Sequence, residues 1–378
     1  MKNGMLTRDD ILTISSAVLK IQSEEITPEV LGGLTIRYHC HITALVDSTE
    51  VEAKIKPQNH EKFTESVRRQ KEIEDENQRL KKEISDLKEK YKNASEPEKK
   101  KIEVKVKQNE EKFTAAQYYE QGFDAYNNDK YDDAIKLYLK SLEIDSNYVS
   151  AWNGLGWAYH NKGNYDKAIE YFNKAIELYP QYASAWNGLG FAYNYKKQFD
   201  KAVNYCRKAI SFDESYSAPW NNLGYAYDKL GDFDSAVTCY QKAIAIDNKD
   251  AATFSNLGTA YTKLNKTDKA IEAYKKALQI DSEYSLAWSN LGYAYSHTGK
   301  FDDAIESFNK ALKIDSNFAV AWNGLGYAYN YKGNFSKAAD ACNKAVKINP
   351  NFANAWNGLG YAYGGQGNFK KSYECEYS

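Results

Sequence analysis

Hydrophobic positions in residues 115–378 recur with a period of 34 residues. A typical period carries a tryptophan, a Leu-Gly pair three and four residues later, a tyrosine three residues after the glycine, and an alanine nine positions further on. The aromatic residues that open the periods are Tyr118, Trp152, Trp186, Trp220, Phe254, Trp288, Trp322 and Trp356. A fixed period of this length is typical of a protein built from structural repeats.

Each period predicts a pair of helices. At 100° per residue the Trp, Leu, Gly and Tyr positions share one face, which gives the first helix an apolar stripe. The second helix, for example 166–178, places Ala168, Phe172 and Ala175 at spacings of four and three residues. Because one helical hairpin cannot bury both its faces, neighbouring hairpins must stack into an extended array with a concave surface.

This pattern resembles the tetratricopeptide repeat (TPR) family, whose W-x2-L-G-x2-Y…A-x3-F…P signature it follows. The first repeat has Gln121-Gly122 in place of Leu-Gly, Cys206 and Cys342 replace the large aromatic residue, and the closing proline survives only as Pro180 and Pro350. The resemblance implies a mainly all-α fold. It would be a right-handed α-solenoid of eight repeats over 115–378, the last one partial, with a partner held in the concave groove.

A highly charged segment, 57–114, precedes the repeats. Apolar residues seven apart, from Ile73 to Ala94, predict a short coiled-coil helix. Ser95 and Glu98 then match a capping box that begins a second helix. An antiparallel hairpin and a dimerising coil both satisfy the pattern, and the shortness of the heptad run favours the hairpin.

Residues 1–56 predict a small α+β segment. A helix is expected from about Asp9 to Gln22, followed by a β-hairpin that turns near Gly32-Gly33, with Ile36 and alternate residues onward facing one side. A unit of this size is marginal on its own, so we expect the segment either to be truncated at its start or to dock on the coil.

The composition of the chain limits which partners and which cellular location are expected. The chain has 50 basic and 51 acidic residues, and Arg207 is the only arginine in 115–378, which argues against a nucleic-acid partner. Its five cysteines are scattered and odd in number, as expected for a reducing compartment. No apolar run approaches the length of a membrane span and the first residues lack a signal core, so a cytoplasmic location is expected.

No enzyme signature is present: the chain lacks a phosphate loop, a dinucleotide fingerprint, a nucleophile elbow and paired zinc ligands. We therefore expect no catalysis and no cofactor. His39 and His41 have a metal-like spacing, but we expect them to lie on a solvated strand face and to bind no metal. Cys206 and Cys342 occupy a core position and are expected to be inert buried thiols.

The candidate binding residues lie away from the core stripe. Five residues after the tryptophan position, aromatic side chains predominate, and asparagines occur one or two residues after it. The predicted partner-binding set is Asn153, Trp157, Asn187, Phe191, Asn222, Tyr225, Asn256, Asn290, Tyr293, Asn323, Tyr327, Asn357 and Tyr361. Amides can bind the peptide units of an extended chain and aromatic rings add contact area, so this ladder suits a protein or extended peptide.

Alternatives stay open. The aromatic residues and asparagines could pack between adjacent repeats without touching a ligand. Similar asparagine ladders occur in the repeat arms of O-linked N-acetylglucosamine transferases, which implies a substrate-targeting arm as a second function. Stacking of single-stranded nucleic acid is a third. Self-association through the coiled segment or the uncapped last repeat is also expected to be possible.

The Asn-Gly-Leu-Gly motif contains one glycine without an apparent packing role: Gly154, Gly188, Gly324 or Gly358. Glycine inside a helix costs about 1 kcal/mol relative to alanine. A groove widened for a ligand, or recent duplication of one repeat, would explain it.

Overall fold

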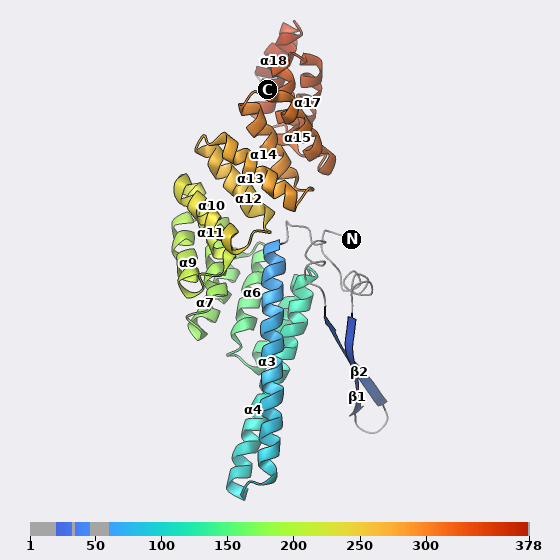
Figure 1. Ribbon diagram of the computed structural model, residues 1–378, viewed down its shortest axis with the longest axis vertical. Helices are drawn as coiled ribbons and strands as arrows, with labels where there is room; N and C mark the ends of the chain where they lie inside the picture. Colours follow the sequence, from blue (N-terminus) through green and yellow to red (C-terminus); the bar gives the residue numbers. More distant parts are fainter. Residues whose placement is uncertain (1–19, 32–34, 46–59, 377–378) are drawn as a thin grey trace.

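The computed structural model describes residues 20–31, 35–45 and 60–376 (Figure 1). Strands β1 (Lys20–Leu31) and β2 (Thr35–Leu45) pair in an antiparallel ladder, with an irregularity between Ile21 and Ser23. The last residues of the helix expected over Asp9–Gln22 are therefore wrong, because residues 20–22 form the start of β1, whose first residues pair with the end of β2. The rest of that helix and the turn at Gly32-Gly33 lie outside the described residues. The α+β segment as a unit stays a prediction.

Helices α3 (His60–Lys92) and α4 (Glu96–Asn127) run antiparallel as a long hairpin. The expected capping box begins α4, because the Ser95 amide donates to Glu98 Oε2 at 3.0 Å. At the hairpin tip Lys88 pairs with Glu110 across the two helices. The sequence left open an antiparallel hairpin and a dimerising coil. The structure has the antiparallel hairpin, which the sequence favoured. Since α4 continues into the first repeat, the expected boundary at residue 114 falls inside a helix.

The remaining helices form the repeats, each a first helix, a tight turn and a second helix. Residues 115–127 of α4 are the first helix of repeat one. The others are α5 (Tyr131–Ile144), α6 (Val149–Asn161), α7 (Tyr165–Leu178), α8 (Ala183–Tyr195), α9 (Phe199–Phe212), α10 (Ser217–Leu230), α11 (Phe233–Ile246), α12 (Ala251–Lys263), α13 (Thr267–Ile280), α14 (Ser285–His297), α15 (Phe301–Ile314), α16 (Ala319–Tyr331), α17 (Phe335–Ile348), α18 (Ala353–Gly365) and α19 (Phe369–Glu376).

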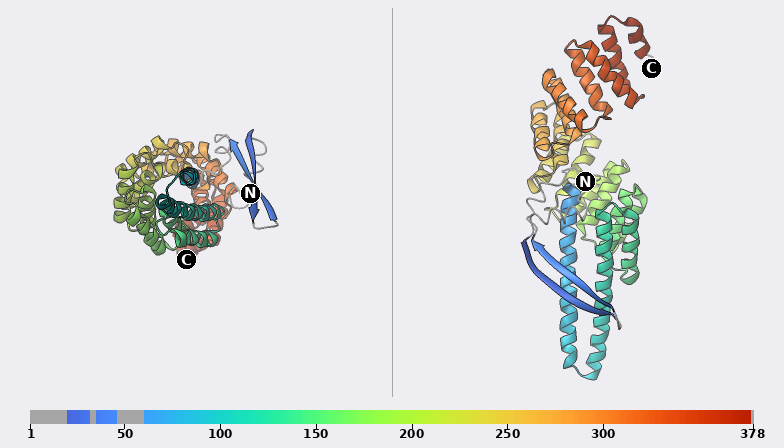
Figure 2. Two further views of the ribbon diagram at one scale, coloured as in Figure 1. Left: turned by 90° about the horizontal axis from the view of Figure 1, so that it is seen from below. Right: turned by 90° about the vertical axis from the view of Figure 1, so that its right-hand side faces the viewer.

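The array curves toward its first helices. Successive first helices, such as α8 and α10 or α16 and α18, touch each other, whereas in the described part of the chain no two second helices touch to a similar extent. The shorter side of a curved stack is the concave one, so the first helices line it. We call this surface the inner face; the repeats wind around it in Figure 2.

In four of the described repeats a buried second-helix side chain lies between a glycine of its own repeat and a glycine of the next. The Phe172 ring is fully buried between Gly156 of its own repeat and Gly188 of the next. A Cβ added at either glycine would lie 2.5 Å from the ring, which no real packing tolerates. Phe308 lies in the same way between Gly292 and Gly324, where the distances would be 2.8 and 2.4 Å.

This packing corrects one sequence expectation. The first glycine of the Asn-Gly-Leu-Gly motif does have a packing role, because it receives the buried side chain of the preceding repeat. Tyr138 packs on Gly154 and Cys342 on Gly358 in the same manner. Neither a widened groove nor duplication alone is needed to explain it.

The recurrent tryptophans tie helix to loop. Trp152 Nε1 donates to the Ser146 carbonyl at 2.9 Å, and Trp186 Nε1 donates to the Pro180 carbonyl at 2.8 Å. The same bond, to the carbonyl six residues earlier, recurs in the other tryptophan repeats. These half-buried indoles thus hold the loop before each first helix against that helix.

Gly188→Ala is expected to destabilise the protein. The new methyl group would overpack the Phe172 ring at a cost of about 1–3 kcal/mol, which outweighs the ~1 kcal/mol gained by alanine in a helix. Gly360→Ala is the matched control, because its Cβ would meet its nearest neighbour at an ordinary 3.4 Å. Thermal unfolding followed by circular dichroism should show a lower Tm for the first variant and an equal or higher Tm for the second. A Gly188→Ala protein as stable as wild type would contradict the packing of Phe172 on Gly188.

Candidate functional site

The inner face is nearly free of charge. Across α12, α14, α16 and α18, Lys263 is the only Lys, Arg, Asp or Glu. The second helices, such as α13 and α15, carry the acidic and basic residues on the outer side. In repeats five to eight, the inner face that a partner would contact therefore consists of tyrosine, asparagine, serine, threonine and small apolar residues.

The predicted partner-binding residues divide into two groups by exposure. Tyr225, Tyr327 and Tyr361 are 37%, 42% and 64% exposed, and Asn357 is also exposed. Half-buried members are Phe191, Asn256, Asn290, Tyr293 and Asn323. The buried members are Asn153, Trp157, Asn187 and Asn222. The accessible part of the set therefore lies in repeats four to eight and is densest in repeats seven and eight.

The buried asparagines connect neighbouring repeats. Asn222 Nδ2 donates to Asn187 Oδ1 at 3.0 Å, and Asn187 Nδ2 donates to the Tyr216 hydroxyl at 3.2 Å. Asn256 donates in the same way to Asn221 at 3.2 Å. These bonds match the bridging alternative that the sequence left open, because each one joins two successive repeats.

Two further asparagines with a bridging role were not singled out from the sequence. Asn194 and Asn330 lie eight residues after their tryptophans, and each Nδ2 donates at 2.9 Å to a backbone carbonyl of the next first helix, at Asn222 and Gly358 respectively. Their recurrence at one repeat position is a signal that could have identified them.

In repeats one to three the inner face is covered by α3. Arg69 of α3 is 3% exposed, donates to Ser184 Oγ of α8 at 3.4 Å, and lies 5.7 Å from the ring centre of Trp157 on α6. Asn153 Nδ2 donates to the same Ser184 oxygen at 3.2 Å. The burial of Trp157 and Asn153 therefore goes together with the presence of a helix from the same chain.

His160 lies beside this contact in an aromatic cluster. Its ring is 4.7 Å from the Phe191 ring and 5.0 Å from the Tyr195 ring. Burial lowers the pKa of His160 from 6.5 to about 4, against a smaller opposing effect of its hydrogen bond to Asn161. The imidazole is therefore neutral at physiological pH and behaves as an aromatic packing residue.

The other titratable groups give no sign of reactivity. Burial raises the pKa of the Cys342 thiol to about 12 and that of Cys239 to about 11, which suppresses the nucleophilic thiolate. Within the described residues no three His, Cys, Asp or Glu side chains gather as metal ligands would, and no helix is both long and apolar enough to cross a membrane. The side chains of His39 and His41 lie outside the described residues.

Asn187→Ala is expected to destabilise the array by about 1–3 kcal/mol, because it leaves the buried amide of Asn222 without its acceptor. Asn357→Ala, at an exposed position of the same motif, should change stability by less than about 0.5 kcal/mol. Urea unfolding of the two variants measures the difference. Equal stabilities would show that the bond between the two amides contributes nothing.

His160 should make stability depend on pH. Below 6.5 the unfolded chain takes up a proton at this residue while the folded protein does not, so stability falls from pH 6.5 toward about 4. His160→Phe removes this loss, which amounts to about 3 kcal/mol over the full range. Unfolding measured at pH 7 and pH 4.5 should show a smaller drop for His160→Phe than for wild type, and an unchanged drop for His297→Phe, whose side chain is exposed. Equal drops in all three proteins would contradict the burial effect.

Solved structures similar to this chain share its fold. A chain of the Cut9–Hcn1 hetero-tetramer of the APC/C has 21% identity and a TM-score of 0.57, covering 65% of this chain and 48% of that one. The pilF protein of Pseudomonas aeruginosa has 18% identity and a TM-score of 0.50, covering 55% of this chain and 94% of that one. No curated protein matches the sequence. The resemblance to O-linked N-acetylglucosamine transferase arms is not singled out by these comparisons and stays a prediction.

Family models identify the repeats directly. Models described as "Tetratricopeptide repeat" match residues 149–182, 181–249, 215–283, 285–318, 319–352 and 341–374, and one described as "TPR repeat" matches residues 117–163. Together they span 117–374, more than half of the 378 residues. The chain therefore belongs to the tetratricopeptide repeat family.

Proposed function

We propose that this protein is a non-catalytic scaffold that binds an extended, uncharged stretch of a partner polypeptide along the inner face of repeats four to eight. Tetratricopeptide repeat proteins bind protein or peptide partners, and this chain has their fold. The observation that carries the finer proposal is the composition of the inner face, where tyrosines and amides outnumber charged residues. Helix α10 carries Asp228 and Lys229 and α12 carries Lys263, whereas α14, α16 and α18 carry no Lys, Arg, Asp or Glu.

The chemistry of this surface suits a peptide backbone. An asparagine amide offers both a donor pair and an acceptor, so it can bond a peptide unit from either side. Asn256, Asn290 and Asn323 are half-buried. Asn256 and Asn323 each use one N–H on a neighbouring repeat, at Asn221 and Tyr293, which leaves each amide a second N–H. The exposed Tyr225 and Tyr327 supply contact area at low entropic cost. A strongly charged ligand would find only Lys263 on α12, α14, α16 and α18.

Single-stranded nucleic acid fits the same surface poorly. Such binders combine stacking side chains with a positively charged track for the backbone. The single arginine of the repeats, Arg207, lies on the second helix α9, where it contacts Tyr227. The tyrosines alone do not supply phosphate neutralisation.

The triple variant Tyr327→Ala, Asn357→Ala and Tyr361→Ala tests the proposal. Peptides enriched from a displayed library on the wild-type protein should lose binding at least about tenfold, because aromatic anchors contribute most of the energy in such contacts. Fluorescence anisotropy with the enriched peptides measures the loss.

Tyr179→Ala is the matched control. Tyr179 is 48% exposed but lies in the loop between α7 and α8, so its removal should leave the affinity unchanged. Wild-type affinity in the triple variant, or equal losses in both proteins, would contradict binding at the inner face.

A further inference from the structure

We infer that the inner face of repeats one to three is a second binding surface, specific for a helix that presents arginine and, one turn later, isoleucine, and that α3 fills it from within the chain. This inference does not depend on what repeats four to eight bind. A partner that uses the first repeats must present the same pattern and compete with α3.

Arg69 is the anchor of the contact. It is joined to Ser184 although 115 residues separate them in sequence, and its guanidinium carbon lies 5.7 Å from the centre of the Trp157 ring. Arg69, Trp157 and Ser184 are 3%, 8% and 2% exposed. Burying a charged guanidinium away from water is unfavourable unless hydrogen bonds and an aromatic face compensate for the lost hydration.

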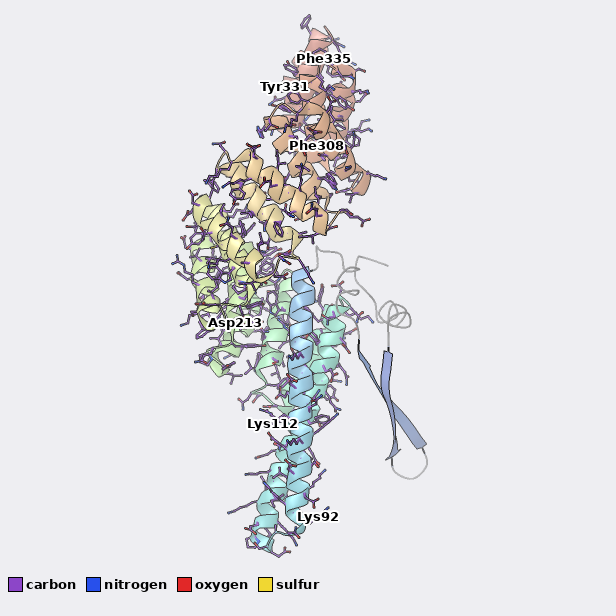
Figure 3. The ribbon with its side chains drawn as sticks, viewed as in Figure 1. Lys92, Lys112, Asp213, Phe308, Tyr331 and Phe335 are labelled. Atoms are coloured by element: carbon purple, nitrogen blue, oxygen red, sulfur yellow. The ribbon has the colours of Figure 1, made fainter. Side chains whose placement is uncertain are left out.

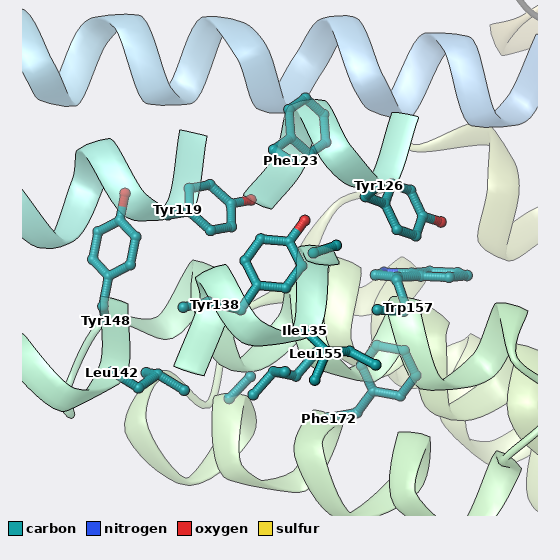
Figure 4. Close-up of a cluster of buried hydrophobic side chains, with 14 of the residues drawn as sticks. Tyr119, Phe123, Tyr126, Ile135, Tyr138, Leu142, Tyr148, Leu155, Trp157 and Phe172 are labelled. Carbon is teal, nitrogen blue, oxygen red and sulfur yellow. The ribbon is translucent and has the colours of Figure 1, made fainter. Parts of the chain in front are cut away.

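The next turns of α3 continue the contact on repeat one. Ile73 is 3% exposed and belongs to the same buried cluster as Tyr119 and Phe123, and Glu76 accepts a hydrogen bond from Tyr148. Figure 4 shows α3 running across this cluster, with Phe123, Tyr119 and Tyr126 nearest to it and Trp157 in the next layer, below Tyr126. Figure 1 shows the upper part of α3 alongside the first repeats, while the tip of the hairpin extends beyond them.

The two halves of α3 differ in what they contact. Near the tip, Lys88 and Tyr91 bond to Glu110 and Glu103 of α4, and these contacts are exposed. Figure 3 labels Lys92, the last residue of α3, at this tip. Near the base, Arg69 reaches past α4 to α6 and α8. Coiled-coil pairing with α4 accounts for the exposed contacts at the tip of α3, but not for the buried contacts of Arg69 at its base.

Repeats seven and eight have the same sequence motif on their inner face as repeats two and three, but α3 does not lie against them. Repeats two, three, seven and eight all contain Trp-Asn-Gly-Leu-Gly followed by an aromatic residue. At that aromatic position Trp157 is 8% exposed, whereas Tyr327 and Tyr361 are 42% and 64% exposed. At this shared position the side chain is exposed in repeats seven and eight, whereas Trp157 in repeat two packs on Phe172 and Phe191 and also lies against Arg69 of α3.

Hydrogen–deuterium exchange of the full chain tests the anchor. Arg69→Ala should raise the exchange rate of residues 60–72 at least about tenfold, as expected for losing a buried hydrogen bond to a charged group. Arg79→Ala is the control, because Arg79 lies on the same helix at 65% side-chain exposure with only i,i+3 and i,i+4 ion pairs to Glu76 and Glu83. Circular dichroism verifies that both variants keep their helices. Wild-type exchange in the Arg69→Ala protein would overturn the inference.

A peptide supplied in trans tests the surface itself. A fluorescent peptide of residues 60–82 should bind the Arg69→Ala protein at least about tenfold more tightly than the wild type, where the tethered α3 competes at high effective concentration. The same peptide carrying Arg69→Ala should lose that advantage. Equal binding of the two peptides, or equal binding of the first peptide to both proteins, would show that the surface does not select arginine.

Discussion

The contact on which the structure depends is the buried ring between two glycines. Phe172 and Phe308 are each held by a glycine of their own repeat and a glycine of the next, at distances that allow no further atom. This contact sets both how closely the two helices of a repeat approach and how the next repeat stacks on them. Protein interiors are packed densely enough that one methyl group at such a place is felt.

The inner face follows from that stacking. Successive first helices touch each other, and the array curves around them. In repeats five to eight nearly all charged residues lie on the second helices, and the asparagines closest to the core connect neighbouring repeats. What remains exposed is a set of tyrosines and amides in repeats four to eight, while α3 lies over the first three.

The repeats could be predicted from sequence because their information is local and recurs every 34 residues. The capping box at Ser95 and the turn that makes α3 and α4 a hairpin are local as well. The packing role of Gly188 could not be predicted from the sequence, because Phe172, which packs on it, belongs to the preceding repeat. Some candidate binding residues are buried by a contact with a neighbouring repeat, which the local sequence does not reveal. Asn187, for example, bonds to the next repeat. Arg69, whose partner Ser184 is 115 residues away, gave no signal at all.

We propose that this scaffold offers partners the sparsely charged inner face of repeats four to eight, and an exchange footprint of the full chain with a bound library-selected peptide tests this most directly. We expect amides of α12, α14, α16 and α18 to be protected, with α13, α15 and α17 unchanged. Protection confined to the second helices, or to α6 and α8 beneath α3, would contradict it.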